Sequence, residues 1–456
     1  MTNGSWSADH AWLPDGFATN VRFEIGTDGM LAAVAPGEEQ RARRIGAYVL
    51  PGMPNLHSHA FQRAMAGLAE RQSNPDDSFW TWREVMYTFA GRIGPDDLRA
   101  IAAQLYVEML KAGYTQVCEF HYLHHRPDGP PYDDPAAMSL ALIEAAREAG
   151  IGLTLLPTLY MTGGFDGRPL SERQRRFHFD AAGYLRLVER LRREESVRVR
   201  VGVALHSLRA VPEAAMREVF DAELTRDCPI HIHIAEQIGE VQDCLAIRNA
   251  RPVDWLLDHA SVNARWCLVH ATHLSDGEVR RLAASDAVAG LCPTTEANLG
   301  DGLFPLKPYL DAGGRIGIGS DSHISVSVVE ELRWLEYGQR LATRRRNIGA
   351  TRDAPSTGET LFRRALAGGA QASAAPVGVL AAGSRADFVV LDETAPLLAG
   401  RDVSNVLDTW IFAGNASLVR NVVVAGEEVV SDFHHRDEER IAARYRDVVE
   451  RLARAG

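Results

Sequence analysis

The chain has 456 residues, of which 46% are hydrophobic and 24% charged, as expected for a folded protein with a large core and room for two domains. Its formal net charge of −11 argues against a nucleic-acid or anionic-membrane partner, because such partners select for a basic surface. The sequence has no apolar run long enough to cross a bilayer and no basic N-terminal segment followed by an apolar one, so a cytoplasmic location is expected.

The two ends of the chain carry strand signals. Those in residues 1–47 are weak, whereas residues 373–456 contain valine-rich runs, two of them separated by a Gly-Glu turn. We expect both ends to assemble into one small β-sandwich domain, with a helix at the C-terminus.

The segment between the ends, residues 48–372, alternates short apolar runs with longer amphipathic stretches, which is typical of βα units around a parallel sheet. Eight strands with intervening helices predict an α/β fold of the (β/α)8 TIM-barrel type, whose active site lies at the C-terminal ends of the strands. The eight runs are residues 47–56, 115–120, 152–159, 199–205, 229–234, 266–269, 287–292 and 315–319.

An aromatic segment, residues 79–89, occupies the long interval between the first two runs and carries Arg83 in its middle. Aromatic clusters of this kind form core or dimer faces, and loops at this end of a barrel also make lids. We expect the segment to be either a lid or a dimer face, and the protein to be a homodimer.

The first run leads directly into His57-Ser58-His59. On a β-strand, residues i and i+2 point to the same face, so both imidazoles can converge on one metal ion. The pair alone is a moderate signal, since any strand can carry two histidines for packing or hydrogen bonding. The metal interpretation depends on further ligands at the ends of other strands.

Three later runs supply such residues. The fifth run contains His231 and His233 on one strand face, followed by Glu236. His233 lies nearer the C-terminal end and is the better ligand candidate, whereas we expect His231 to be hydrogen-bonded in the barrel interior. Glu236 reaches the site only if the strand ends soon after His233. The sixth run ends at His270, and the eighth is followed by Asp321.

These positions predict a metal site. Three imidazoles and a carboxylate suit Zn²⁺, with Fe²⁺ and Mn²⁺ as alternatives on ligand type. A catalytic metal lowers the pKa of its bound water from about 15.7 towards about 7. Asp321 can accept a proton from that water, Glu236 can carry one to a leaving group, and His270 can polarise the reacting group or act as a further ligand. The predicted metal ligands are His57, His59, His233 and Asp321.

This pattern resembles the amidohydrolase superfamily, and the resemblance covers most of the chain. Members of that family join a (β/α)8 barrel to a β-sandwich made from both termini. The C-terminal stretch Gly-Ser-Arg-Ala-Asp-Phe-Val-Val-Leu-Asp is similar to the family's returning sandwich strand. The residues that carry the resemblance in the barrel are His57, His59, His233, His270 and Asp321.

The resemblance also implies the number of metal ions. Binuclear members of the family use a carboxylated lysine at the end of the fourth strand. Here that position falls near His206, and the lysines of the chain, Lys111 and Lys307, lie in other segments. One metal per subunit is therefore expected. The His-x-x-Glu at residues 233–236 resembles the mononuclear deaminase branch, in which the glutamate handles protons while ammonia leaves.

Within that branch, the local match is to deiminases of N-formimino-L-glutamate. It is carried by residues 57–67, 79–87, 119–124 and 205–211. The resemblance implies hydrolysis of this small dicarboxylate to N-formyl-L-glutamate and ammonia, as in histidine degradation. The substrate contacts that it suggests are Gln62, Arg83, Tyr122, His206 and Arg209.

The residue chemistry is compatible with a dicarboxylate. Arg209, just past the fourth strand, offers a bidentate fork to one carboxylate, and Arg83 or Gln62 with Tyr122 can hold the other. One alternative is a mononuclear aminohydrolase of a nucleobase such as guanine, which would favour aromatic stacking over paired arginines. Another is a non-catalytic scaffold of the same fold. The sequence does not separate formiminoglutamate from formiminoaspartate, because one methylene contributes only about 1–3 kcal/mol of discrimination.

Overall fold

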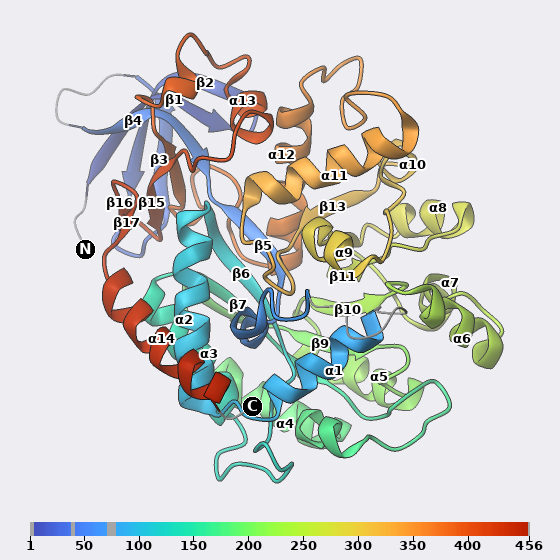
Figure 1. Cartoon of the computed structure of the whole chain (residues 1–456). Helices are drawn as coiled ribbons and strands as arrows, with labels where there is room; N and C mark the ends of the chain where they lie inside the picture. The colour runs from blue at the N-terminus through green and yellow to red at the C-terminus, as the bar shows by residue number, and fades with distance from the viewer. Residues whose placement is uncertain (1–3, 38–41, 71–78, 455–456) are drawn as a thin grey trace.

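The computed structural model describes residues 4–37, 42–70 and 79–454, which form a central barrel and a separate sheet (Figure 1). The barrel strands run parallel, and helices surround them. In spatial order these strands are β5 (Met53–Ser58), β6 (Tyr114–His121), β7 (Gly152–Leu159), β9 (Val203–Ser207), β10 (Ile230–Ile234), β11 (Trp266–His270), β12 (Val288–Leu291) and β13 (Arg315–Ile318). A short strand, β8 (Val199–Val201), pairs with β7 outside this order. The predicted (β/α)8 barrel is confirmed.

The barrel closes between its first and last strands. The backbone N–H of Asp321 donates to His57 O at 3.0 Å, and that of His59 donates to Asp321 O at 3.2 Å. The loop after β13 therefore continues the ladder onto β5. This close approach needs Gly319, because a Cβ there would lie 2.8 Å from the backbone nitrogen of His57. Closure thus brings the ends of β5 and β13 side by side.

Two of the predicted apolar runs are each divided between two strands. The run at 47–56 breaks at Gly52, so that β4 (Arg43–Pro51) joins the terminal sheet and β5 joins the barrel. A Cβ at Gly52 would lie 2.1 Å from Oγ1 of Thr115, so the chain can pass this point only with a glycine. The run at 199–205 is likewise divided between β8 and β9. The single strands predicted for these two runs are therefore wrong.

Both ends of the chain build the second sheet, as predicted. Its strand order is β17 (His434–His435), β16 (Glu427–Ser431), β15 (Val419–Val424), β14 (Phe388–Leu391), β4, β1 (Ser5–Leu13), β2 (Gly16–Ile25) and β3 (Leu31–Pro36). The N-terminal and C-terminal strands meet where β14 pairs antiparallel with β4. A separate small core stabilises this sheet, in which the rings of Phe23 and Phe388 lie 4.8 Å apart.

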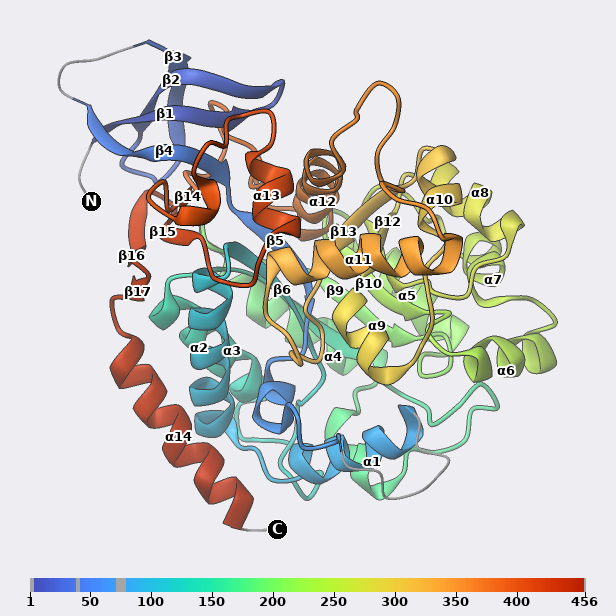
Figure 2. The same ribbon diagram turned by 45° about the horizontal axis from the view of Figure 1, so that its top comes forward.

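Helices cover the outside of the barrel (Figure 2). In the described part of the chain they are α1 (Phe79–Ala90), α2 (Pro95–Lys111), α3 (Ala137–Ala149), α4 (Ala181–Arg192), α5 (Glu213–Asp221), α6 (Ile238–Arg248), α7 (Pro252–His259), α8 (Asp276–Ala284), α9 (Pro293–Leu299), α10 (Leu306–Asp311), α11 (Val328–Thr343), α12 (Thr357–Ser373), α13 (Val406–Phe412) and α14 (Glu438–Arg454), with short 3₁₀ helices η1 (Ala60–Met65), η2 (Glu172–Phe177), η3 (Glu223–Thr225) and η4 (Pro396–Leu398). None of the described helices is both long and apolar enough to cross a membrane.

The C-terminal helix α14 lies along α2 on the outside of the barrel (Figure 2). It buries Ile441, Val448 and Leu452, which recur at spacings that place them on one helical face. The remaining positions are mostly charged, as expected for a helix with one face exposed to solvent. The predicted C-terminal helix is confirmed.

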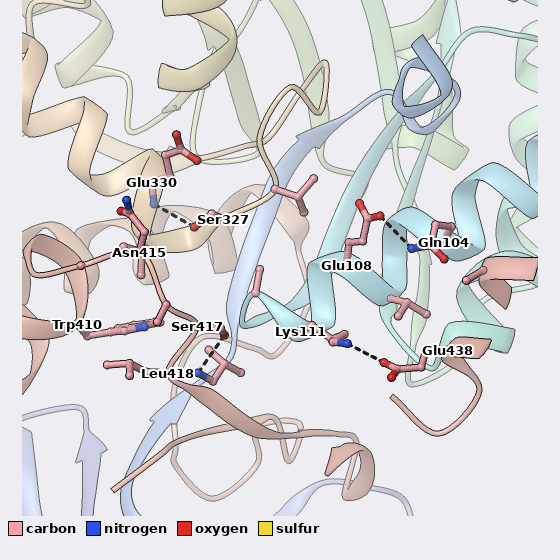
Figure 3. A pocket seen from close by; sticks show the side chains of 18 of the residues that line it. Gln104, Glu108, Lys111, Ser327, Glu330, Trp410, Asn415, Ser417, Leu418 and Glu438 are labelled. Atoms are coloured by element: carbon pink, nitrogen blue, oxygen red, sulfur yellow. Dashed lines mark hydrogen bonds and ion pairs between the residues drawn. The ribbon is translucent and has the colours of Figure 1, made fainter. Parts of the chain in front are cut away.

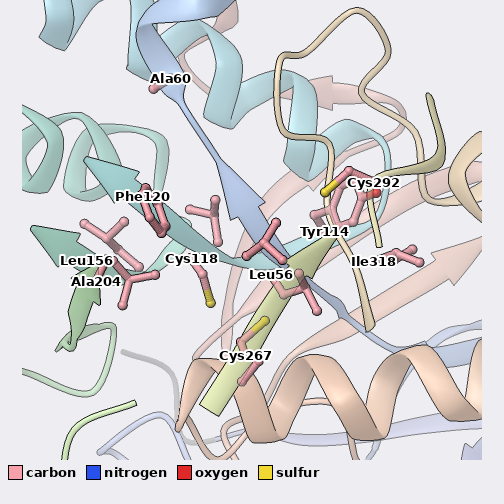
Figure 4. Packing of buried hydrophobic residues seen from close by; sticks show 14 of the residues in the cluster. Leu56, Ala60, Tyr114, Cys118, Phe120, Leu156, Ala204, Cys267, Cys292 and Ile318 are labelled. Atoms are coloured by element: carbon pink, nitrogen blue, oxygen red, sulfur yellow. The ribbon is translucent and has the colours of Figure 1, made fainter. Parts of the chain in front are cut away.

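Apolar side chains fill the barrel below the predicted site (Figure 4). Leu56 of β5 and Cys267 of β11 are both fully buried there. Gly290 of β12 makes room for them, because a Cβ at this position would lie 2.8 Å from both Cys267 Sγ and Leu56 Cδ1. The barrel is therefore a packed core rather than a pore, and the predicted site lies at its C-terminal end.

Candidate active site

Three imidazole rings converge at the C-terminal ends of β5 and β10. Nε2 of His57 lies 3.1 Å from Nε2 of His59 and 3.0 Å from Nε2 of His233. Oδ1 of Asp321 lies 3.5 Å from Nε2 of His57 and 3.4 Å from Nε2 of His59. All these side chains are buried. The structure therefore brings the predicted metal ligands into one group.

The outer ring nitrogens define the protonation of two of these rings. Nδ1 of His59 lies 2.8 Å from Phe120 O, and Nδ1 of His233 lies 2.9 Å from His206 O, so both Nδ1 atoms donate a proton. Burial lowers the pKa of His59 to about 3 and that of His233 well below its usual value. Both rings are therefore neutral, and their Nε2 lone pairs point at Nε2 of His57.

A divalent cation fits this arrangement. Nε2 of His57 holds at most one proton and so cannot satisfy both neighbouring lone pairs. A cation bound at the usual distances of about 2.0–2.2 Å would accept electron density from all three rings and from Asp321. Neutral imidazoles combined with a carboxylate suit Zn²⁺ and related divalent metals. Burial raises the pKa of Asp321 to about 7, and a neighbouring cation favours its charged form.

His231 lies apart from this group although it shares strand β10 with His233. Its Nε2 lies 2.9 Å from Ala372 O in α12, and its side chain is fully buried. It is thus a hydrogen-bonded residue inside the protein, and only His233 of this pair reaches the other imidazoles.

His270, at the end of β11, lies beside the metal group and between three carboxylates. Its Nδ1 lies 3.3 Å from Oε1 of Glu296, and its Nε2 lies 3.7 Å from Oδ2 of Asp321 and 3.8 Å from Oε1 of Glu236. Burial disfavours the charged imidazole, but these carboxylates outweigh it and raise the pKa of His270 to about 10. This environment suits a hydrogen-bond donor to a reacting group better than a metal ligand.

The backbone at these strand ends adopts left-handed conformations that non-glycine residues rarely take. The φ angles are +51° at Ala235, +66° at His270, +48° at Ala271, +48° at Asp321 and +60° at His323. Each such residue costs of order 1–3 kcal/mol unless the surrounding structure holds it. The bends end the regular side-chain alternation of the strands, so that residues just beyond them can face the barrel axis.

Glu236 depends on one of these bends. Strand β10 ends at Ile234, and the backbone N–H groups of Ala235 and Glu236 each donate to the carboxylate of Glu240 at 3.1 Å. The chain therefore turns directly after the strand, which is the condition under which Glu236 was expected to reach the site. Burial raises the pKa of Glu240 to about 7.

A cavity adjoins the metal group, and the predicted catalytic residues line it together with Gln62, Arg83, Tyr122, His206 and Arg209. Within it, Nε2 of Gln62 donates to the Tyr122 hydroxyl at 3.0 Å. The Arg83 guanidinium lies 5.5 Å from the ring centroid of Tyr87. The structure thus places every predicted substrate-binding residue in the space that the metal and catalytic residues share.

Helix α1 forms part of the wall of this cavity. Trp82, Arg83, Met86 and Tyr87 line it, so the described part of the aromatic segment faces the predicted site. The side chains of residues 79–81 lie outside the described residues. The hypothesis of a dimer face stays a prediction.

Several residues of the site were not predicted from the sequence. Tyr160 directly follows the third apolar run, and Glu296 lies four residues after the seventh, as Arg209 lies four after the fourth. Glu240 lies four residues after Glu236, and Tyr87 lies four after Arg83. The sequence signal that could have identified Tyr160 and Glu296 was their position after apolar runs. For Glu240 and Tyr87 it was the spacing of four residues from a predicted site residue.

A larger groove, of about 1080 Å³, lies on the outside of the barrel between α2, α11 and α14 (Figure 3). Nζ of Lys111 lies 2.7 Å from Oε2 of Glu438 there, and Nε2 of Gln104 donates to Oε1 of Glu108 at 2.9 Å. None of the predicted site residues lines this groove. The smaller cavity beside the imidazoles is therefore the candidate active site.

Comparison with known proteins identifies the family of the chain. The sequence model of the amidohydrolase family matches residues 48–429, and that described as "Formimidoylglutamate deiminase HutF, N-terminal domain" matches residues 7–43. The chain is 56% identical over 447 residues to a formimidoylglutamate deiminase from Pseudomonas aeruginosa, covering 98% of each protein.

Solved structures show the same fold. The crystal structure of an amidohydrolase from Brucella melitensis has a TM-score of 0.93 and 46% identity, over 99% of this chain and 100% of that one. An atrazine chlorohydrolase from Arthrobacter aurescens, crystallised with zinc, has a TM-score of 0.83 and 22% identity, over 98% of this chain and 99% of that one. The second likeness concerns the fold alone. Together with the family match over most of its length, these findings show that the chain belongs to the amidohydrolase family.

Proposed function

We propose that the chain hydrolyses N-formimino-L-glutamate to N-formyl-L-glutamate and ammonia, a step of histidine degradation. The 56% identity to a formimidoylglutamate deiminase over 98% of both chains supports this substrate. The observation that carries the proposal is the cavity, in which Arg83 and Arg209 line the same space as the imidazole group. Two guanidinium groups beside a metal site suit a substrate that carries two carboxylates.

The metal of this proposal is one Zn²⁺ ion, held by His57, His59, His233 and Asp321. The neutral imidazoles with inward-facing lone pairs support it, and Fe²⁺ and Mn²⁺ share the same ligand preferences. When bound, such an ion lowers the pKa of a coordinated water towards about 7, so that the water can act as a nucleophile near neutral pH.

The side chains around this position handle the protons. Asp321 accepts a proton from the attacking water, whose oxygen forms a bond to the formimino carbon. The terminal nitrogen needs two protons to leave as ammonia. Glu236 delivers both, one that Asp321 took from the attacking water and one from the hydroxyl group that the attack creates, and the bond between carbon and that nitrogen breaks. His270 donates a hydrogen bond to the attacked group. The nearby carboxylates of Glu236, Glu296 and Asp321 favour the protonated imidazole that this role requires. Water supplies the oxygen of the formyl product.

The remaining cavity residues hold the glutamate part of the substrate. Arg209 takes one carboxylate through two parallel hydrogen bonds, and Arg83 takes the other. The Gln62–Tyr122 pair and His206 bind polar groups nearer the formimino end, since the rings of Tyr122 and His206 lie beside the metal group, with centroids 5.0 Å from His59 and 5.1 Å from His233.

The experiment is ammonia release by metal-loaded protein from a panel of N-formimino-L-glutamate, N-formimino-L-aspartate and guanine. We expect turnover of the glutamate compound and a rate constant kcat/KM at least about 10-fold lower for the aspartate compound, because one methylene contributes about 1–3 kcal/mol. Ammonia from guanine but not from formiminoglutamate would overturn the proposal in favour of a nucleobase aminohydrolase. A protein that binds metal but turns over none of the three would favour a scaffold.

A further inference from the structure

Ser58, the residue between the two histidine ligands of β5, faces away from the metal group. It is fully buried, and its Oγ donates to Oε2 of Glu119 in β6 at 2.5 Å. The other oxygen of Glu119 accepts the backbone N–H of Ala60 at 2.6 Å, and the hydroxyl of Tyr106 donates to Oε2 at 3.3 Å. One carboxylate therefore holds both residues that flank His59.

The same serine is linked to the last barrel strand. Its Oγ lies 3.2 Å from Nε2 of His323, whose Nδ1 lies 3.0 Å from Oγ of Ser320. The side chain of Asn55 in β5 donates to the Ser320 hydroxyl at 2.7 Å and accepts the backbone N–H of Ser320 at 3.1 Å. This connection joins β5 to the loop that carries Asp321, at the point where the barrel closes.

These hydrogen bonds form a series in which every group donates towards Glu119. Ser58 donates its proton to Glu119 and so accepts one from His323. A neutral His323 with its proton on Nε2 satisfies that need and leaves Nδ1 to accept from Ser320. Ser320 then accepts from the amide of Asn55. Because each buried donor has one acceptor, removal of any member leaves a buried polar group unpaired, at a cost of about 1–3 kcal/mol.

β6 also orients a metal ligand directly. Residue 120, next to Glu119, supplies the carbonyl that accepts the Nδ1–H of His59 at 2.8 Å. Two adjacent residues of β6 thus position His59. Phe120 orients its ring, and Glu119 holds its backbone through Ser58 and Ala60. The ligands from β5 and the carboxylate after β13 share a single buried framework.

We propose that Glu119, Ser58 and His323 are positioning residues of the metal site, which set its affinity by fixing the backbone of residues 57–60 against that of residues 320–323. They touch neither the metal nor the substrate. The inference rests on the metal centre of the proposed function, but it does not depend on which substrate is bound. Partners that orient metal ligands typically contribute about 10- to 100-fold to metal affinity.

The test compares Ser58→Ala and Glu119→Gln with Thr154→Val, in the full chain. Thr154 is a matched control, because it is fully buried in β7 and its hydroxyl donates to Ser373 O at 2.8 Å, away from the metal group. Zinc affinity is measured by competition with a chelator, and the unfolding midpoint of each metal-free protein is measured alongside. We expect Ser58→Ala and Glu119→Gln to weaken zinc binding about 10- to 100-fold and Thr154→Val to leave it within about 3-fold of wild type.

Two results would overturn the inference. One is zinc affinity within about 3-fold of wild type in both Ser58→Ala and Glu119→Gln. The other is an equal loss of affinity in Thr154→Val, which would assign the effect to lower stability of the barrel as a whole. A wild-type protein that binds zinc tightly but releases no ammonia from formiminoglutamate would contradict the proposed function alone. A wild-type protein that binds no zinc, iron or manganese would overturn both.

Discussion

The carboxylate of Glu296 lies 3.3 Å from Nδ1 of His270, and the same oxygen accepts the backbone N–H of Cys292 at 2.9 Å. Glu296 is in the first turn of α9, directly after β12, so it links the end of β12 to a side chain of the neighbouring strand β11. It holds the His270 ring with Nε2 facing Glu236 and Asp321.

Replacing Glu296 by glutamine should therefore lower kcat by about 10- to 100-fold with little change in KM. Glutamine retains a hydrogen-bonding oxygen but removes the charge that favours a protonated His270. Glu336→Gln is the matched control, because Glu336 is also fully buried but accepts the backbone N–H groups of Ile348 and Gly349 away from the cavity. Steady-state kinetics check this, and an unchanged kcat would show that His270 acts without its partner.

The two histidines of β10 should differ sharply in metal binding. His233→Asn removes a nitrogen that lies 3.0 Å from Nε2 of His57, whereas His231→Asn alters a residue bonded to Ala372 O. We expect the purified His233 variant to retain little metal and the His231 variant to retain wild-type stoichiometry. Metal analysis after dialysis measures this. Equal loss of metal in both variants would contradict the ligand assignment.

Removal of either cavity arginine should weaken substrate use. Arg209→Met and Arg83→Met each remove a charged hydrogen-bonding group, which we expect to lower kcat/KM by about 10- to 100-fold, corresponding to about 1.5–3 kcal/mol. The exposed Arg217, which pairs with Glu213 on α5, supplies the control variant Arg217→Met. If both cavity variants kept wild-type kinetics, the two carboxylates of the substrate would have to bind elsewhere.

Glu236→Gln should abolish most turnover while leaving the metal in place. The amide keeps the shape of the side chain but cannot deliver the protons that ammonia needs to leave, and general acid catalysis typically contributes about 10²- to 10⁴-fold. We expect a fall in kcat of that order with unchanged metal content. Normal turnover by this variant would contradict the proton-transfer role.

The buried His231 should make the folded protein less stable in mild acid. Burial lowers its pKa from 6.5 to about 4, so its contribution is complete above pH 6.5 and is lost as the pH falls towards 4, because the unfolded chain then binds a proton that the folded protein excludes. At about 1.4 kcal/mol per pKa unit, the free energy of unfolding of wild type should fall about 3 kcal/mol more than that of His231→Gln over this range. Denaturant unfolding at pH 8, 6.5 and 4 measures this, and parallel curves would contradict it.

Much of the fold could be predicted because the apolar pattern of a segment reflects how that segment is buried in the folded protein. A barrel strand such as β7 is buried at every position, so it appears in the sequence as a nearly continuous apolar run. The prediction was wrong where one run served two sheets, as at Gly52, since both β4 and β5 bury apolar side chains. The dipeptide Pro51-Gly52 is the local signal of this break, and the close contact with Thr115 on a neighbouring strand is the structural reason for the glycine.

The site was predictable to the extent that its residues follow strand ends. His57, His59, His233 and Asp321 could be proposed as a set because a parallel barrel gathers all its strand ends on one side. The positions of Glu240 and Glu296 after strand ends were visible in the sequence, but their roles were not, because each acts through a backbone or ring that only the folded chain brings within hydrogen-bonding distance. The predicted homodimer and its interface stay predictions.

The segment His57-Ser58-His59 separates what the sequence determined from what the tertiary structure decided. The sequence by itself determined that two imidazoles share one strand face, because the side-chain period of a strand is two residues. Only the tertiary structure decided that His233 and not His231 joins them, that Phe120 O turns the lone pair of His59 inward, and that Ser58 reaches the network behind. Those outcomes depend on contacts between residues more than 60 positions apart in the chain, whose distances are set by how the barrel closes.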